Sequence, residues 1–218
     1  MRIVDLTKET AENILENMLK RSPTQYGTYE AAVNEIVTAV REKKDAAVFS
    51  YTEKFDGAKL DASSVEVTEE EVEEAYRQVD EGLIDVIRKA RANILAYHEK
   101  QKENSWFTST EEGTLLGQKV TPLNRVGVYV PGGKAAYPSS VLMNVLPAQV
   151  AGVREICMVT PCNREGKVNP VVLAAAKEAG VQRIFKIGGA QAVAALAYGT
   201  ESIPKVDKIV GPGNIYVA

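Results

Sequence analysis

The spacing of apolar residues predicts that the first part of the chain is helical. From Tyr29 to Tyr51, apolar residues recur close to every 3.6 positions, the period of an amphipathic helix with one buried face. A shorter segment over 14–19 has the same spacing and predicts a helix that ends near Ser22-Pro23. These patterns concern folding, and none of them requires a particular function.

A further helical pattern begins at Thr68. Thr68 and Glu71 have the spacing of a capping box, in which each side chain binds the backbone amide of the other residue. Apolar residues then continue at helical spacing to Tyr97, which predicts one long helix bent at Gly82. The acidic run 69–74 is interpreted as a solvated helix start, because acidic side chains stabilise the positive end of a helix; a metal site is the alternative.

Beyond these helices the pattern becomes β-like and then alternates. Two short stretches, 106–110 and 114–120, joined by Glu111-Glu112-Gly113, predict a β-hairpin. After Pro122, apolar strands alternate with helices. The predicted strands are 126–130, 156–160, 183–187 and 208–210, and the predicted helices are 139–150, 170–179 and 190–198. Connections this short predict an α/β fold, with a parallel sheet covered by helices on its faces.

Composition supports a division of the chain into two parts and indicates which class of ligand it binds. The whole chain has a net charge of -3, but residues 1–112 carry -9 and residues 113–218 carry +6. The second part also holds 13 of the 16 Gly and eight of the nine Pro. Its basic excess forms no Lys/Arg cluster, so a small anionic ligand is a better prediction than nucleic acid. No apolar run is long enough to cross a membrane and the start lacks a signal-peptide core, which predicts a cytoplasmic protein.

Glycine-rich loops follow three of the four predicted strands. These loops are Pro131-Gly132-Gly133, Gly188-Gly189-Ala190-Gln191 and Gly211-Pro212-Gly213-Asn214. Ligands of parallel sheets bind beyond the carboxyl ends of the strands, where glycine lets backbone amides approach a phosphate. Gln191 and Asn214 add neutral amides there, and Tyr129 ends the first strand. Since neither a G-x-G-x-x-G nor a Walker A motif is present, these residues predict only a nucleotide or phosphate ligand.

Three strings of residues resemble the histidinol dehydrogenase family. They are RVGVYVPGGKAAYPSSVLMN (125–144), GGAQAVAALAYGT (188–200) and PKVDKIVGPGN (204–214). The resemblance implies that 121–218 is a Rossmann-like NAD-binding domain and that 1–120 is part of the family's catalytic domain. It implies that Tyr129, Gln191 and Asn214 contact NAD. It also implies a homodimeric enzyme that uses NAD and zinc to oxidise L-histidinol, in two steps, to L-histidine.

The sequence departs from this family at its carboxyl end. In the family, a Gln, an Asp and two His bind zinc, and a Glu-His pair acts as acid and base; all follow the G-P-G-N loop. Here four residues follow that loop, and the single histidine, His98, lies in a charged helical stretch that predicts a surface position. We therefore expect the NAD-binding half of the enzyme, with no catalytic residue or metal ligand, and no histidinol oxidation by this chain alone.

Two other functions remain open from the sequence. The chain could be a nucleotide-binding module without catalysis, or an enzyme similar to aldehyde dehydrogenases. The second alternative needs a nucleophilic cysteine at the cofactor edge, and Cys162 is the only candidate. Cys157 and Cys162 are separated by four residues, but we interpret them as a core cysteine and an incidental loop thiol, rather than a zinc pair or a disulfide.

Overall fold

The computed structural model describes residues 7, 10, 27–132 and 136–217. The helix predicted over 14–19 lies outside the described residues. Among the helices that are described, none is both long and apolar enough to cross a membrane.

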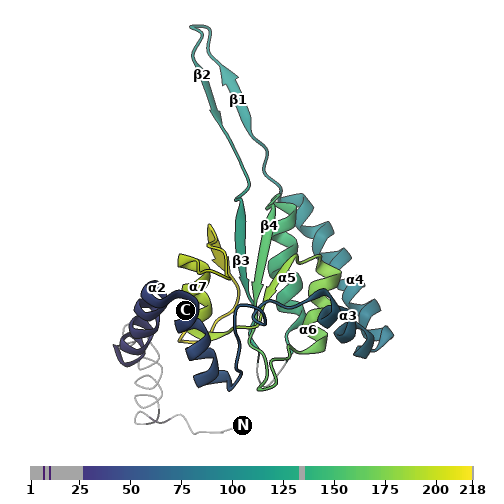
Figure 1. Cartoon of the computed structure of the whole chain (residues 1–218). Helices are drawn as coiled ribbons and strands as arrows, with labels where there is room; N and C mark the ends of the chain where they lie inside the picture. Colours follow the sequence, from purple (N-terminus) through teal and green to yellow (C-terminus); the bar gives the residue numbers. More distant parts are fainter. Residues whose placement is uncertain (1–6, 8–9, 11–26, 133–135, 218) are drawn as a thin grey trace.

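A four-stranded parallel sheet forms the centre of the molecule (Figure 1). Its strands are β3 (Arg125–Tyr129), β4 (Glu155–Val159), β5 (Arg183–Phe185) and β6 (Lys208–Val210), in the spatial order β5-β4-β3-β6. On β3, Val126 pairs with Ile156 of β4 on one side and with Lys208 of β6 on the other. The predicted strands are thus confirmed, although β5 ends two residues earlier than expected.

Helices connect consecutive strands and cover both faces of the sheet. The connecting helices are α5 (Pro138–Val150), α6 (Pro170–Ala179) and α7 (Gly189–Tyr198). Asn169 caps α6 by accepting a hydrogen bond from the backbone of Val171, and Gly180 ends it in the left-handed conformation. Helices α5 and α6 contact each other on one side of the sheet, and α7 covers the other side. The predicted α/β fold with flanking helices is confirmed.

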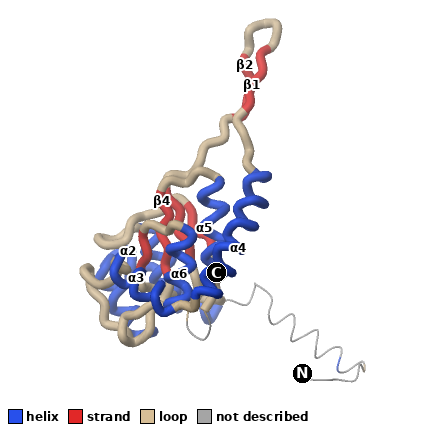
Figure 2. Tube along the Cα trace, turned by 90° about the vertical axis from the view of Figure 1, so that its right-hand side faces the viewer, coloured by secondary structure: helices blue, strands red, loops and turns tan. Residues whose placement is uncertain are grey.

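The amino-terminal helices form an outer layer on each side of the sheet. They are α2 (Gly27–Asp56), α3 (Glu69–Gln78) and α4 (Glu81–His98), followed by the 3-10 turn η2 (Glu99–Gln101). Helix α2 packs against α7 (Figure 1). Helix α3 contacts α6, and α4 contacts α5 and α6 (Figure 2). Apolar residues of α2, such as Val40 and Val48, share a buried cluster with Phe185 of the sheet. The division into domains at residue 120 stays a prediction.

The prediction of one long helix from Thr68 to Tyr97 is wrong. The capping box of Thr68 and Glu71 is present, but α3 ends at Gln78. Val79 is extended, and Asp80 starts α4 by accepting a hydrogen bond from the backbone of Leu83. An Asp in this position satisfies amides that a new helix leaves free. The chain therefore changes direction before Gly82, and at a helix cap rather than at a glycine.

The predicted hairpin is confirmed and extends away from the body of the molecule. Strands β1 (Trp106–Ser109) and β2 (Leu115–Gln118) pair antiparallel, and every residue in them is exposed. Figure 1 shows the hairpin projecting from the end of the sheet at which β3 begins. It is therefore remote from the glycine loops, which follow the opposite ends of the strands.

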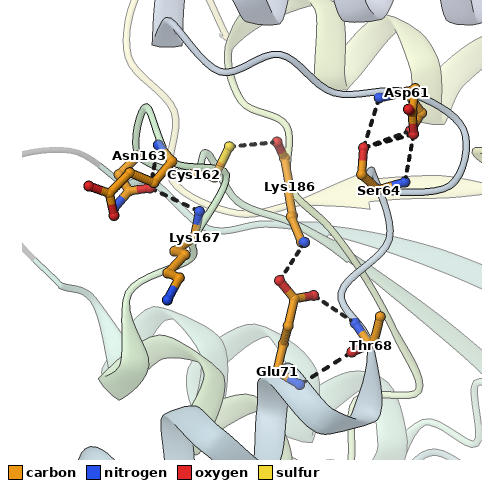
Figure 3. A network of polar contacts seen from close by, with 9 residues as sticks. Asp61, Ser64, Thr68, Glu71, Cys162, Asn163, Lys167 and Lys186 are labelled. Atoms are coloured by element: carbon orange, nitrogen blue, oxygen red, sulfur yellow. Dashed lines mark hydrogen bonds and ion pairs between the residues drawn. The ribbon is translucent and has the colours of Figure 1, made fainter.

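A buried ion pair joins the outer layer to the sheet. Lys186, which is 6% exposed, directly follows β5, and its ammonium lies 2.6 Å from a carboxylate oxygen of Glu71. The other oxygen of Glu71 accepts the backbone N–H of Thr68 and completes the capping box (Figure 3). The backbone of Lys186 donates to Val65, so the segment before α3 also covers the open edge of β5. One carboxylate thus fixes both the start of α3 and a buried cation.

We expect Glu71→Gln to lower the free energy of unfolding by about 2–3 kcal/mol, because it leaves the Lys186 ammonium buried without its partner. Glutamine retains the capping function, so the loss reports the ion pair. Adding Lys186→Met removes the unpaired charge and should restore most of the stability. Urea denaturation of the wild type, both single variants and the double variant measures this coupling. Additive losses would contradict it.

Candidate functional site

The sheet reverses its strand order next to β3. The chain builds β3, β4 and β5 in one direction and then returns through α7 to place β6 on the other side of β3. In open parallel sheets, such a reversal separates the loops at the carboxyl ends of the two neighbouring strands and leaves a crevice for a ligand. The loops after β3 and β6 are two of the three glycine-rich loops of the sequence.

A cavity of about 610 Å³ lies at this position. Tyr129, Gly132, Gly189, Gln191 and Asn214 are among the residues that line it, and we call it the switch-point cavity. Each of the three glycine-rich loops therefore contributes to one cavity. All three residues that the sequence singled out for ligand binding lie in its wall.

Tyr129 connects the end of β3 to the start of α7. Its side chain is buried, and its hydroxyl accepts a hydrogen bond of 3.1 Å from the backbone N–H of Gly189. Burial raises the pKa of the Tyr129 hydroxyl, an effect that the bond from Gly189 partly opposes. The hydroxyl therefore stays protonated at neutral pH, and its own hydrogen can be donated to a ligand.

Gln191 lies in the first turn of α7 and is 1% exposed. Its side-chain oxygen Oε1 is buried and has no hydrogen-bond partner in the described structure. An unpaired buried amide oxygen costs about 1–3 kcal/mol, so such a group calls for an explanation. The first backbone amides of a helix also lack partners within it and attract anions. This end of the switch-point cavity is therefore suited to a ligand with both hydroxyl and phosphate groups.

Asn214 is positioned by a close contact between two strands. Gly211, with a φ of 138°, follows β6, and a Cβ atom added to it would lie 2.1 Å from the carbonyl oxygen of Tyr129. Only glycine fits there, which allows the loop to turn across β3. Three residues later, the exposed Asn214 accepts a hydrogen bond from the backbone of Tyr216 through Oδ1, which fixes its orientation and leaves its NH2 group for a ligand.

Helix α2 supplies a wall that the sequence did not predict. Glu35, Tyr51, Phe55 and Asp56 all line the switch-point cavity. The rings of Tyr51 and Phe55 are stacked, with their centroids 5.7 Å apart, and the Lys54 ammonium lies over both. In the sequence these residues continue an ordinary amphipathic helix. The one unusual feature is a carboxylate, Asp56, at the last position of a helix, where a negative charge is unfavourable.

Comparison with known proteins identifies the family. A family model described as histidinol dehydrogenase matches residues 19–218. Histidinol dehydrogenase of Geobacillus kaustophilus is 57% identical over 209 residues, which are 95% of this chain and 49% of that protein. The enzyme of Aquifex aeolicus is 56% identical over 220 residues, which cover 100% of this chain and 50% of that protein. This chain belongs to the histidinol dehydrogenase family.

A solved structure supports the same assignment. The crystal structure of histidinol dehydrogenase from Elizabethkingia anophelis superimposes with a TM-score of 0.81 and 40% sequence identity. The match covers 86% of this chain and 43% of that one. The chain thus spans about half the length of the histidinol dehydrogenases that it matches.

Cys162 does not lie in the switch-point cavity. It lines a separate cavity of about 400 Å³ next to α3 and α6, and its thiol donates to the backbone oxygen of Lys186 (Figure 3). Burial is the largest cause that raises the pKa of the Cys162 thiol, to about 11, and that of Cys157 to about 12. Both cysteines are free and buried. A protonated, buried thiol is a poor nucleophile, so nothing supports the interpretation as an aldehyde-dehydrogenase-like enzyme.

We expect both cysteines to resist alkylation in the folded chain. Because burial raises the pKa of both thiols far above neutral pH, very little of either is present as the reactive thiolate, and burial slows attack further. Iodoacetamide at pH 7.5 should therefore modify the native chain at least about 100 times more slowly than the chain in urea. Mass spectrometry resolves the two sites. Rapid modification of Cys162 in the native chain would contradict this and revive the nucleophile hypothesis.

His98 lies at the end of α4, outside the switch-point cavity. Its Nδ1 is 2.6 Å from the side-chain oxygen of Gln101, and its ring is half-buried against a groove below the hairpin. The acidic residues 69–74 instead open α3, as the capping prediction required. Within the described part of the chain, no three side chains of His, Cys, Asp or Glu are grouped as a metal site requires.

Proposed function

We propose that this chain is the NAD-binding part of a histidinol dehydrogenase, which oxidises L-histidinol to L-histidine in two steps. The observation that carries the proposal is the switch-point cavity, which brings Tyr129, Gln191 and Asn214 together beside the start of α7. Sequence identities of 56–57% to histidinol dehydrogenases support the reaction class.

The residues of the cavity fit a dinucleotide. The buried Oε1 of Gln191 needs a donor, which a carboxamide or a ribose hydroxyl provides. The backbone amides that follow Gly189 in the first turn of α7 have no partner within the helix and suit a pyrophosphate. Asn214 and the Tyr129 hydroxyl add neutral donors, which orient polar groups of the ligand without attracting a second charge. When bound, NAD supplies the acceptor for the hydride that leaves the alcohol and then the aldehyde.

The described residues do not offer a zinc site. The chain contains one histidine, and His98 is remote from the switch-point cavity. The zinc that the resemblance implies for the whole enzyme therefore has no set of ligands among the described residues. The same reasoning supports the proposal that the 218 residues bind the cofactor but do not catalyse the reaction alone.

The proposal extends to the setting of the enzyme. We propose a cytoplasmic homodimer, with residues 1–120 contributing to a catalytic domain and residues 121–218 forming the NAD-binding domain. The proposed partner is the small-molecule substrate L-histidinol, without nucleic acid or membrane. The thinly spread basic charge of 113–218 supports a small anionic ligand over a polymer.

We expect the chain to bind NAD in calorimetric titration. Gln191→Ala and Asn214→Ala should each weaken binding about tenfold, the effect of losing one hydrogen bond of about 1.4 kcal/mol. Gln78→Ala is the matched control, because Gln78 is an exposed amide on α3, remote from the switch-point cavity. Equal affinities for all four proteins would show that the assigned contacts are wrong.

We expect no reduction of NAD when the purified chain is mixed with L-histidinol and zinc. Absorbance at the wavelength of NADH, with a full-length family member as a positive control, measures this. Turnover that depends on added zinc would overturn the assignment of this chain to cofactor binding alone, and would require a metal site formed by its own residues.

A further inference from the structure

The carboxylate of Asp56 is placed where folding alone does not favour it. Asp56 is the last residue of α2, next to the negative end of the helix. Its side chain is half-buried, and its oxygen Oδ2 is inaccessible to solvent and has no hydrogen-bond partner in the described structure. Burial raises the pKa of this carboxyl group above its ordinary value. Each of these features makes the unliganded, ionised side chain unfavourable.

No cationic side chain forms an ion pair with Asp56 among the described residues. The Lys54 ammonium, which belongs to the same wall, lies 5.4 Å from the centre of the Phe55 ring instead. Glu35, the second acidic side chain in the same wall, accepts a hydrogen bond from Tyr51. Helix α2 therefore presents two carboxylates to the switch-point cavity, Asp56 at its last position and Glu35 in its first half, and a phosphate group placed beside them would be repelled.

The switch-point cavity thus has two electrically different walls. The start of α7, with Gly189 and Gln191, carries the positive end of a helix and neutral amides. The α2 wall carries two carboxylates, that of Asp56 at the last position of the helix and that of Glu35 in its first half, beside the ammonium of Lys54. A ligand with a pyrophosphate and free ribose hydroxyls matches both walls, because a hydroxyl can donate to a carboxylate that lacks a partner. A ligand with a phosphate on that ribose matches only the first wall.

We propose that Asp56 is a specificity-determining residue, which accepts a ribose hydroxyl of the dinucleotide and excludes a dinucleotide that carries a 2′-phosphate. This inference rests on the proposed binding of NAD in the switch-point cavity. An acidic side chain that binds the ribose hydroxyls is a general device for this discrimination. Here the acid comes from a helix that precedes the sheet in sequence, rather than from the end of a neighbouring strand.

The test is calorimetric titration of the 218-residue chain with NAD and with NADP, for the wild type, Asp56→Asn and Glu53→Gln. Glu53 is the matched control, because it lies one turn earlier on α2, is exposed, and does not line the cavity. We expect Asp56→Asn to weaken NAD binding about tenfold, as the loss of one charged hydrogen bond, and to lower the preference for NAD over NADP at least tenfold. Glu53→Gln should change neither by more than about twofold.

Thermal denaturation of the same variants separates binding from folding. Asp56→Asn should melt no lower than the wild type, because it removes a charge that the fold disfavours. An unchanged preference for NAD over NADP in a variant that still binds NAD overturns the inference but not the proposed function. A lower melting temperature with an unchanged preference assigns Asp56 to folding and also overturns it. A folded wild type that does not bind NAD overturns the proposed function and the inference with it.

Discussion

The close approach of β6 to β3 is the constraint on which the site depends. The two strands are parallel neighbours, and the carboxylate of Asp207 accepts the backbone N–H groups of Asn124 and Arg125 where they begin. Where they end, Gly211 crosses so close to Tyr129 that no side chain fits. Because β3 is already paired with β4, this second pairing reverses the strand order and opens the switch-point cavity. Asn214 and Tyr129 are brought together by the same contact.

Helix α2 completes the cavity because contacts away from the cavity hold it against α7. The Lys44 ammonium donates to the carbonyl oxygen of Gly199 at the end of α7, and Ser202 donates to the Asp45 carboxylate. Lys44 also has a non-helical backbone, with a φ of 50°, which changes the direction of α2 at this point. Apolar residues of α2, including Ile36 and Val40, are buried in the cluster that α7 covers. The acidic wall of the cavity is therefore fixed by contacts outside it.

Two unpaired buried oxygens mark the site. Among the described residues, four buried side-chain nitrogen or oxygen atoms lack a hydrogen-bond partner, and two of them are the Nε atoms of Arg91 and Arg125. The other two are oxygens of Gln191 and Asp56, and both of these residues line the switch-point cavity. A buried polar group without a partner can persist in a native protein where a ligand supplies the missing hydrogen bond. The two unpaired oxygens lower the stability of the unliganded chain, and the proposed dinucleotide would raise it on binding.

The sequence by itself determined the order of strands and helices and the positions of the glycine-rich loops. It also singled out Tyr129, Gln191 and Asn214 as candidates for ligand binding. These follow from apolar periodicity, from loops at strand ends and from a family resemblance, all of which are local in the chain. Only the tertiary structure decided that Asp56 lies in the same cavity, since α2 reaches it by packing on α7, 133 residues later in sequence. It also decided that the helix after Thr68 breaks at Asp80 and not at Gly82. Local sequence patterns indicate which face of a helix is buried. They do not indicate which polar group at the end of a helix forms a hydrogen bond or ion pair, because that depends on contacts between distant segments.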